Sequence, residues 1–158
     1  MPKIYAIIHD GLKVLVGSGG RSGDPPALRS GLHLPGGRRE VGETNSAAVI
    51  REVLEETGIV LAADKARHDF DLVLDGTQVY FIVFQIDSVE DAIVGRTIPD
   101  VINVHDEPFE AVQTLAIAGC YQDPGFSQEH WTDWFGEGLF RAIEREMFAE
   151  EDSSVANA

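Results

Sequence analysis

The sequence predicts an α+β fold in one domain, with a mixed and largely antiparallel sheet. Three observations support this fold class. Runs of β-forming residues come in pairs joined by short turns, helical patterns between them are few, and the 158 residues suffice for one hydrophobic core. Because strands and helices do not alternate regularly, a doubly wound parallel sheet fits the sequence less well.

The N-terminal pair of β-rich runs covers residues 3–8 and 12–17. Asp10 and Gly11 lie between them, and an Asp-Gly pair in this position is a strong hairpin signal. The pattern therefore predicts two antiparallel neighbours at the start of the chain.

The next segment, residues 18–30, is rich in Gly, Pro and Ser and predicts a surface loop. A short strand is expected at residues 31–34. It runs into a turn that we expect at Pro35, Gly36 and Gly37.

Helical periodicity then predicts a helix from Thr44 to Thr57, with Thr44 as its N-cap and Gly58 ending it in a left-handed conformation. Apolar residues at helical spacing indicate the buried face, which we expect to consist of Ala47, Ile50 and Leu54, with Val49 and Val53 alongside.

Residues 68–75 and 78–87 read as a second hairpin around Gly76 and Thr77. The later strand is apolar almost throughout, which predicts a central place in the sheet. Residues 88–108 are mixed and predict a loop. Residues 110–117 fit either a last strand or the start of a helix.

An amphipathic helix is predicted near the C-terminus, where apolar residues recur every four positions: Trp131, Phe135, Leu139, Ile143 and Met147. The domain is expected to cover residues 1–151. The polar tail, residues 152–158, is expected to be disordered.

The formal net charge of −15 argues against binding to long nucleic acids or anionic membranes. Basic residues gather in the N-terminal third, namely Arg21, Arg29, Arg38, Arg39 and Arg51. A binding face for a small polyanion and scattered, solvated arginines in a loop fit this composition equally well. The one cysteine, Cys120, allows no intrachain disulfide, and Asp10 ends the first apolar stretch too early for a signal peptide or a membrane span. We therefore expect a soluble, cytoplasmic protein.

Three carboxylates on the predicted helix, those of Glu52, Glu55 and Glu56, lie at i, i+3 and i+4 and so project from one face. Like charges at this spacing repel, and Mg²⁺ is the ion that oxygen ligands of this kind hold beside substrate phosphates. Arg51 can orient a carboxylate, and Glu43 can reach the same cluster. Taken alone, such a run also fits a solvated helix face.

The spacing of the whole segment decides between these readings, because it resembles the Nudix box. The positions of that motif are filled here by Gly37, Glu43, Arg51, Glu52, Val53, Glu55, Glu56, Gly58 and Ile59. A chance match in one chain is on the order of 10⁻⁷. One departure lies before the box, where His33 replaces an aromatic residue such as Trp that many relatives carry.

The resemblance implies an α/β/α sandwich whose helix carries a metal site, and hydrolysis of a nucleoside diphosphate linked to another group. Mg²⁺ is the implied cofactor, with Mn²⁺ as a substitute. The implied metal ligands are Glu52, Glu55, Glu56 and the Gly37 carbonyl. Glu52 is also a candidate base, with Arg51 orienting it and Glu43 supporting the site.

Residues outside the box are weaker candidates. Arg38 and Arg39 adjoin the glycine turn and are expected to contact substrate phosphates. Glu110, and after it Glu107, are candidates for a further base or ligand, although a solvated acid is an equal reading. Side chains for which a structural role is expected instead are His9, His33, His68, His105, His130, Cys120, Trp131, Trp134 and Phe135.

Two alternatives to a hydrolase remain: a nucleotide-sensing module without turnover, and an isomerase-type relative acting on an isoprenoid diphosphate. Both types usually have an incomplete box, whereas this one is intact. The expected partner is a small nucleotide, such as a nucleoside triphosphate, a dinucleoside polyphosphate or a nucleotide sugar. The sequence does not indicate an oligomeric state.

Overall fold

Two parallel strands, β1 (Lys3–His9) and β6 (Thr77–Gln85), form the middle of the sheet in this computed structural model. The structure describes residues 2–19, 32–74, 76–98 and 108–118. In β1 every residue between the two ends is buried, and β6 is buried from Phe81 to Phe84, as expected of strands covered on both faces. The predicted central place of the second apolar strand is confirmed.

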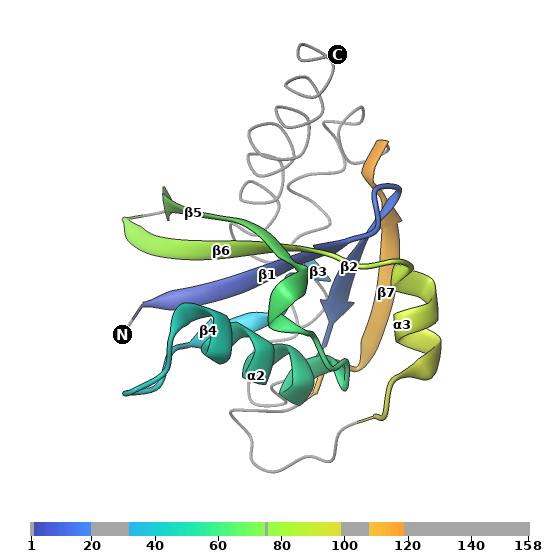
Figure 1. Ribbon diagram of the computed structural model, residues 1–158, viewed down its shortest axis with the longest axis horizontal. Coiled ribbons are helices and arrows are strands. Elements are labelled where there is room, and N and C mark those ends of the chain that lie inside the picture. Colours follow the sequence, from blue (N-terminus) through green and yellow to red (C-terminus); the bar gives the residue numbers. More distant parts are fainter. Residues whose placement is uncertain (1, 20–31, 75, 99–107, 119–158) are drawn as a thin grey trace.

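The other strands are antiparallel to their neighbours and complete a mixed sheet, which confirms the predicted α+β class (Figure 1). Within the described residues the order is β3-β2-β1-β6-β5, while β4 pairs with β1 and β7 pairs with β2. The bounds of these strands are β2 Lys13–Ser18, β3 Leu32–His33, β4 Gly36–Arg38, β5 Ala66–Leu74 and β7 Ala111–Ala116.

Both predicted hairpins are present. β1 turns into β2 with His9 opposite Val14, and β5 turns into β6 through Gly76, whose φ of 76° is left-handed. Within residues 110–117, which fit either a strand or the start of a helix in sequence, Ala111–Ala116 form β7 against β2.

The predicted turn at Pro35, Gly36 and Gly37 is wrong in part, because Gly36–Arg38 is the strand β4, paired with β1. Gly36 has a φ of 156°, and a Cβ atom there would lie 2.2 Å from the carbonyl oxygen of Ile4. The glycine therefore serves a close approach between two strands. As a result, β1 pairs with β4 near its start and with β2 near its end.

Side chains of the sheet alternate between two buried clusters, one on each face. Tyr5 and Ile7 belong to the first cluster, whereas Ile4, Ala6 and Ile8 belong to the second. The second cluster also contains residues of α2 (Asn45–Thr57) and α3 (Val89–Gly95), which lie on the same side of the sheet (Figure 1). A 3₁₀ turn at Ala63–Lys65 connects α2 to β5.

The helix α2 confirms the predicted span, the caps and part of the predicted buried face. Val49 and Val53 are buried and Ile50 is half-buried, as expected. The prediction is wrong for Ala47, which is exposed, and for Leu54, which is 45% exposed. The physical reason lies in the glutamates. Because the side chains of Glu52 and Glu56 are turned toward β4, the inward face of the helix is part apolar and part acidic.

The loop predicted for residues 88–108 is wrong in its first part, where α3 forms. Ser88 caps this helix by accepting a hydrogen bond from the Asp91 backbone N–H at 3.1 Å. The helix is only seven residues long, so its periodicity is a weak signal in sequence.

Several predictions fall outside the described residues. They concern most of the 18–30 loop, the helix from Trp131 to Met147, and the tail 152–158. Among the described helices, none is both long enough and apolar enough to cross a membrane.

Candidate active site

The helix α2 is held at both ends by the residues expected from sequence. The Thr44 hydroxyl accepts a hydrogen bond from the Ala47 backbone N–H at 3.1 Å. At the other end Gly58 adopts a φ of 77°, and its N–H donates to the Leu54 carbonyl at 2.9 Å. These caps satisfy backbone groups that a helix end leaves unpaired, and they fix where the acidic residues face.

The strand β4 lies against the acidic side of α2. A Cβ atom on Gly37 would lie 2.7 Å from the carboxyl carbon of Glu52, so only glycine lets the backbone approach this carboxylate. The neighbouring Gly36 N–H donates to the Glu56 carboxylate at 2.7 Å. Two of the predicted ligands therefore meet the glycine strand directly.

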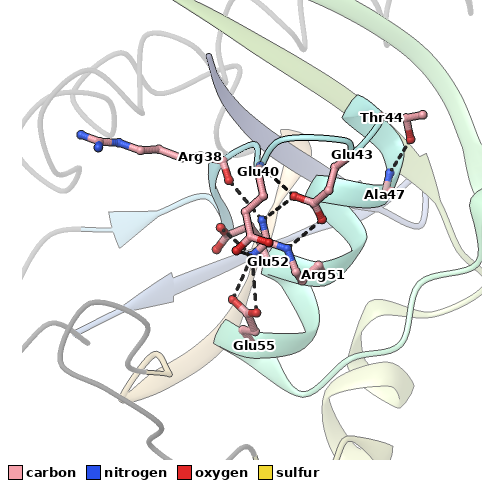
Figure 2. A network of polar contacts seen from close by, with 8 residues as sticks. All are labelled: Arg38, Glu40, Glu43, Thr44, Ala47, Arg51, Glu52 and Glu55. Atoms are coloured by element: carbon pink, nitrogen blue, oxygen red, sulfur yellow. Dashed lines mark hydrogen bonds and ion pairs between the residues drawn. The ribbon is translucent and has the colours of Figure 1, made fainter. Parts of the chain in front are cut away.

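Arg51 is the centre of the polar network (Figure 2). Its guanidinium donates to both oxygens of Glu43 at 2.8 and 2.9 Å, to Glu52 at 3.1 Å and to Glu55 at 3.2 Å. It also donates to the Arg38 carbonyl at 3.1 Å. The planar guanidinium of Arg51 thus connects Arg38 and Glu43, which precede the helix, to the carboxylates of α2.

The hydrogen bond from Arg51 lowers the pKa of Glu43 to about 2, assisted by the hydrogen bond from the Glu40 backbone N–H. The same contact with Glu43 raises the pKa of Arg51 above its ordinary value. Both groups are charged throughout the physiological pH range, so the network is a fixed array of charges.

The two arginines expected to meet substrate differ from each other. The Arg39 guanidinium donates to the Asn45 side chain at 2.8 Å, which ties it to the first turn of α2. The Arg38 side chain is exposed and extends away from the carboxylates (Figure 2). Arg38 is therefore the better placed of the two to reach a ligand in solution.

The donor set around β4 fits a hard divalent cation in its chemistry, since Glu52, Glu55, Glu56 and the Gly37 carbonyl all offer oxygen. The side chains are not gathered as a bound ion would gather them. Among the described residues no group of three or more His, Cys, Asp or Glu side chains is arranged to hold a metal. Instead Arg51 holds Glu52 and Glu55, while Gly36 holds Glu56.

The segment before β7 reaches the C-terminal end of α2. The Phe109 N–H donates to the Glu56 carbonyl at 2.9 Å, and the Glu110 N–H donates to the Ser18 carbonyl at 2.9 Å. The Glu110 side chain lies directly over Gly19, where a Cβ atom would be 2.6 Å away. Glu110 thus lies next in sequence to a residue bonded to the box helix, whereas Glu107 is outside the described residues.

The sequence did not indicate three further contributors to this region: Glu40, Asn45 and Phe109. Glu40 and Asn45 flank the box positions, so their contacts depend on the loop conformation. Phe109 meets α2 only through the tertiary fold. The Gly36 amide was recognised as part of a glycine turn but not as a hydrogen-bond donor to Glu56.

Three of the histidines lie within the described residues. The His9 ring nitrogen accepts a hydrogen bond from the Gly11 N–H at 3.1 Å in the first hairpin, and the His33 ring lies 6.0 Å from that of Phe109. His68 lies in β5. The remaining candidates fall outside the described residues, namely Arg21, Arg29, His105, Cys120, His130, Trp131, Trp134 and Phe135.

A model of the NUDIX domain family matches residues 2–135 of the chain. The comparison with curated proteins gave no significant match. Among solved structures, a bifunctional NMN adenylyltransferase/ADP ribose pyrophosphatase from Francisella tularensis, in complex with AMP and a manganese ion, has a TM-score of 0.63 at 19% identity. That alignment covers 90% of this chain and 40% of the other.

Two smaller proteins are also similar in fold. A MutT/nudix family protein from Enterococcus faecalis has a TM-score of 0.55 at 18% identity, covering 92% of this chain and 62% of that one. The MutT protein from Methanosarcina mazei Go1 has a TM-score of 0.53 at 20% identity, covering 92% and 94%. The chain therefore spans less than two thirds of the length of several of the structures that it resembles.

Proposed function

The chain belongs to the NUDIX domain family, and from this premise we propose that it is a divalent-metal-dependent pyrophosphohydrolase acting on a small nucleoside diphosphate derivative. Water attacks phosphorus, and the pyrophosphate bond between the nucleotide and its second group breaks. The products are two phosphorylated fragments, each of which retains one side of the former anhydride.

One observation carries the proposal: the oxygen ligands of the box lie together beside the glycine strand β4. The Glu52 carboxylate lies against Gly37, and the Glu56 carboxylate accepts the Gly36 N–H at 2.7 Å. Arg51 holds Glu55 next to Glu52. Carboxylate and carbonyl oxygens in a partly buried site are the ligands that hard divalent cations prefer.

In this proposal each side chain has a distinct task. Glu52, Glu55, Glu56 and the Gly37 carbonyl would hold Mg²⁺, or Mn²⁺ in its place. The chemistry supplied by such an ion would be charge neutralisation at the substrate phosphates and activation of water. A Glu52 carboxylate oxygen would take the proton of the attacking water. Arg51 orients Glu52, and Glu43 holds Arg51 from the opposite side.

Residues outside the cluster handle the substrate. Arg38, exposed beside the glycine strand, binds substrate phosphate, and Arg39 contributes to the same surface from its position against Asn45. Glu110 is a candidate for an additional base or ligand, supported by the hydrogen bond of its neighbour Phe109 to α2. The nucleotide and manganese bound by the Francisella tularensis protein agree with this choice of ligands.

Composition supports a small nucleotide as the substrate. The net charge of −15 opposes long nucleic acids and anionic membranes, whereas one or two phosphates can be neutralised locally. We place the enzyme in the cytoplasm, in keeping with a single cysteine, and assign residues 1–151 to one domain.

The direct test is turnover of a nucleotide panel with Mg²⁺, containing nucleoside triphosphates, dinucleoside polyphosphates and nucleotide sugars. Products are identified by mass spectrometry after reaction in ¹⁸O-labelled water. We expect one class to be cleaved at its pyrophosphate bond, with one ¹⁸O in a product and no turnover after chelation of the metal. Absence of turnover across the panel would favour a nucleotide-sensing module.

The substitution Glu56→Gln links turnover to the box. A glutamine oxygen can still accept the Gly36 hydrogen bond, so the fold should persist while a ligand charge is lost. Loss of a residue that only supports a metal ligand lowers metal affinity or activity roughly 10- to 100-fold. Because Glu56 is proposed as a ligand itself, we expect kcat to fall by about 100-fold or more. The control is Glu90→Gln, on α3 and paired with Lys13, which should leave kcat unchanged. Parental turnover by Glu56→Gln would overturn the proposed role of this carboxylate.

A further inference from the structure

The residue Glu56 is held from two sides. Its carboxylate accepts the Gly36 N–H at 2.7 Å, and its backbone carbonyl accepts the Phe109 N–H at 2.9 Å. This carbonyl belongs to the last turn of α2, where backbone acceptors have no partner within the helix. The segment before β7 therefore completes the C-terminal end of the helix that carries the box glutamates.

The ring of Phe109 is seated on a glycine of β2. A Cβ atom on Gly17 would lie 2.2 Å from the nearest ring carbon and 2.5 Å from the next. Such distances are far inside van der Waals contact, so any side chain at this position would displace the ring. Gly17 lies two residues after Leu15 in β2, so a side chain at this position would project from the face of the sheet that α2 covers.

The Phe109 ring also contacts the neighbouring strand, β3. His33 of β3 is the register partner of Gly17, and its ring centroid lies 6.0 Å from that of Phe109 at an interplanar angle of 59°. Tilted aromatic pairs at this separation are favourable. The Phe109 ring thus meets two strands of the sheet, while its backbone meets α2.

We propose that Phe109, seated on Gly17, is a positioning residue that fixes the last turn of α2 and with it the carboxylates of Glu55 and Glu56. This inference rests on the proposed function, since it assigns the placement of those carboxylates to a contact outside the box. Phe109 acts through the helix and does not itself touch the substrate. The next residue, Glu110, has its side chain over Gly19, which directly follows β2.

The size of the expected effect follows from geometry. Displacement of a catalytic group by about 1 Å can lower the rate roughly 100-fold, and loss of a supporting partner lowers metal affinity or activity roughly 10- to 100-fold. A Cβ atom at Gly17 would lie 2.2 Å from the ring, so the ring and the segment that carries it must move. We therefore expect kcat and metal affinity to fall together, while KM for the nucleotide changes little.

The experiment compares Gly17→Ala, Phe109→Ala and the double variant with the parent. The matched control is Gly95→Ala, because a Cβ atom at Gly95 would meet no atom within 4 Å. Two quantities are measured: steady-state kcat and KM with Mg²⁺, and the dissociation constant for Mn²⁺ alone, without nucleotide, from the electron paramagnetic resonance of free Mn²⁺. Thermal unfolding without metal shows that each variant is folded.

We expect each single variant to lower kcat and weaken Mn²⁺ binding about 10-fold, with the control at parental values. In the double variant the added methyl no longer meets a ring, so Gly17→Ala should have no further effect in the Phe109→Ala background. If Gly17→Ala fails to fold, Phe109→Ala alone provides the test, since it removes atoms without crowding the strand.

Two results would overturn the inference. The first is that Phe109→Ala retains kcat and Mn²⁺ affinity within about twofold of the parent. The second is that the effects of the two substitutions add independently in the double variant. If the parent hydrolyses none of the nucleotides tested, the proposed function fails, and the Mn²⁺ titration still decides whether Phe109 positions the carboxylates.

Discussion

Each of the helices α2 and α3 is joined to the sheet by a group of polar contacts, and the two groups differ in how their carboxylates are held. At the start of α3, one carboxylate of Asp10 accepts the backbone N–H groups of Leu12, Lys13 and Val89 at 2.8 to 3.0 Å. At α2, the guanidinium of Arg51 pairs with four carboxylates: Glu43, Glu52 and Glu55 at 2.8 to 3.2 Å, and Glu40 at 3.9 Å. The first junction holds one carboxylate through backbone N–H groups, and the second gathers several carboxylates around one side-chain cation.

This difference separates a structural carboxylate from the carboxylates that we propose as metal ligands. Burial tends to raise the pKa of Asp10, but hydrogen bonds from Val89, Lys13 and Leu12 lower it below its ordinary value. Asp10 is thus bound to the backbone of the fold. The carboxylates around Arg51 are held by a side chain beside the glycine strand. The following predictions test this contrast, from the largest effect to the smallest.

The largest effect is expected for Arg51→Lys, which keeps the positive charge but loses the planar fork. A lysine cannot reach Glu43, Glu52 and Glu55 together, so the carboxylates would lose their orientation. We expect kcat to fall roughly 10- to 100-fold, with KM little changed. Steady-state kinetics at saturating Mg²⁺ measures this. A proportional rise in KM with unchanged kcat would show that Arg51 binds substrate instead.

A smaller and purely structural effect is expected for Asp10→Asn. The amide can accept with one oxygen only, so at least one backbone donor at the turn or at Val89 loses its partner. We expect a loss of about 1–2 kcal/mol in the free energy of unfolding, and unchanged kcat below the unfolding transition. Urea unfolding measures the loss. The control is Asp71→Asn, an exposed residue that accepts from the Gln78 side chain. A reduced kcat in Asp10→Asn would show that the role of Asp10 is not purely structural.

The smallest effect concerns acid stability. Because Arg51 lowers the pKa of Glu43 from 4.5 to about 2, this carboxylate stabilises the fold above pH 4.5, and the contribution is lost as the pH falls toward 2. Part of it is screened by solvent. In Glu43→Gln the free energy of unfolding should therefore decline less steeply between pH 4.5 and pH 2 than in the parent. Equal slopes would mean that the ion pair adds no stability.

The sequence predicts the parts of the site that depend on local spacing. Thr44 and Gly58 bound the helix as expected, and Glu52, Glu55 and Glu56 share the side that faces β4 or Arg51. Helical periodicity and capping are properties of consecutive residues, so a single chain is enough to find them.

Features that depend on tertiary contacts were missed. Hydrophobicity alone predicts that Leu54 is more buried than Glu52. In the structure Leu54 is 45% exposed, whereas the Glu52 side chain lies against Gly37 of β4. Gly36 was assigned to a turn because glycine is ambiguous between a turn and a close approach of strands. No sequence pattern indicated a role for Phe109, because its ring contacts Gly17, a residue far away in the chain.

The change of partner along β1 joins the site to the centre of the sheet. Gly36 and Gly37 pair with the start of β1, a strand that is bonded along its length to β6 and buried between its end residues. The surface on which phosphate chemistry would occur is therefore continuous with the buried centre of the sheet. Substitutions deep in the sheet, remote from every carboxylate, should consequently impair turnover at temperatures where the molecule still remains folded.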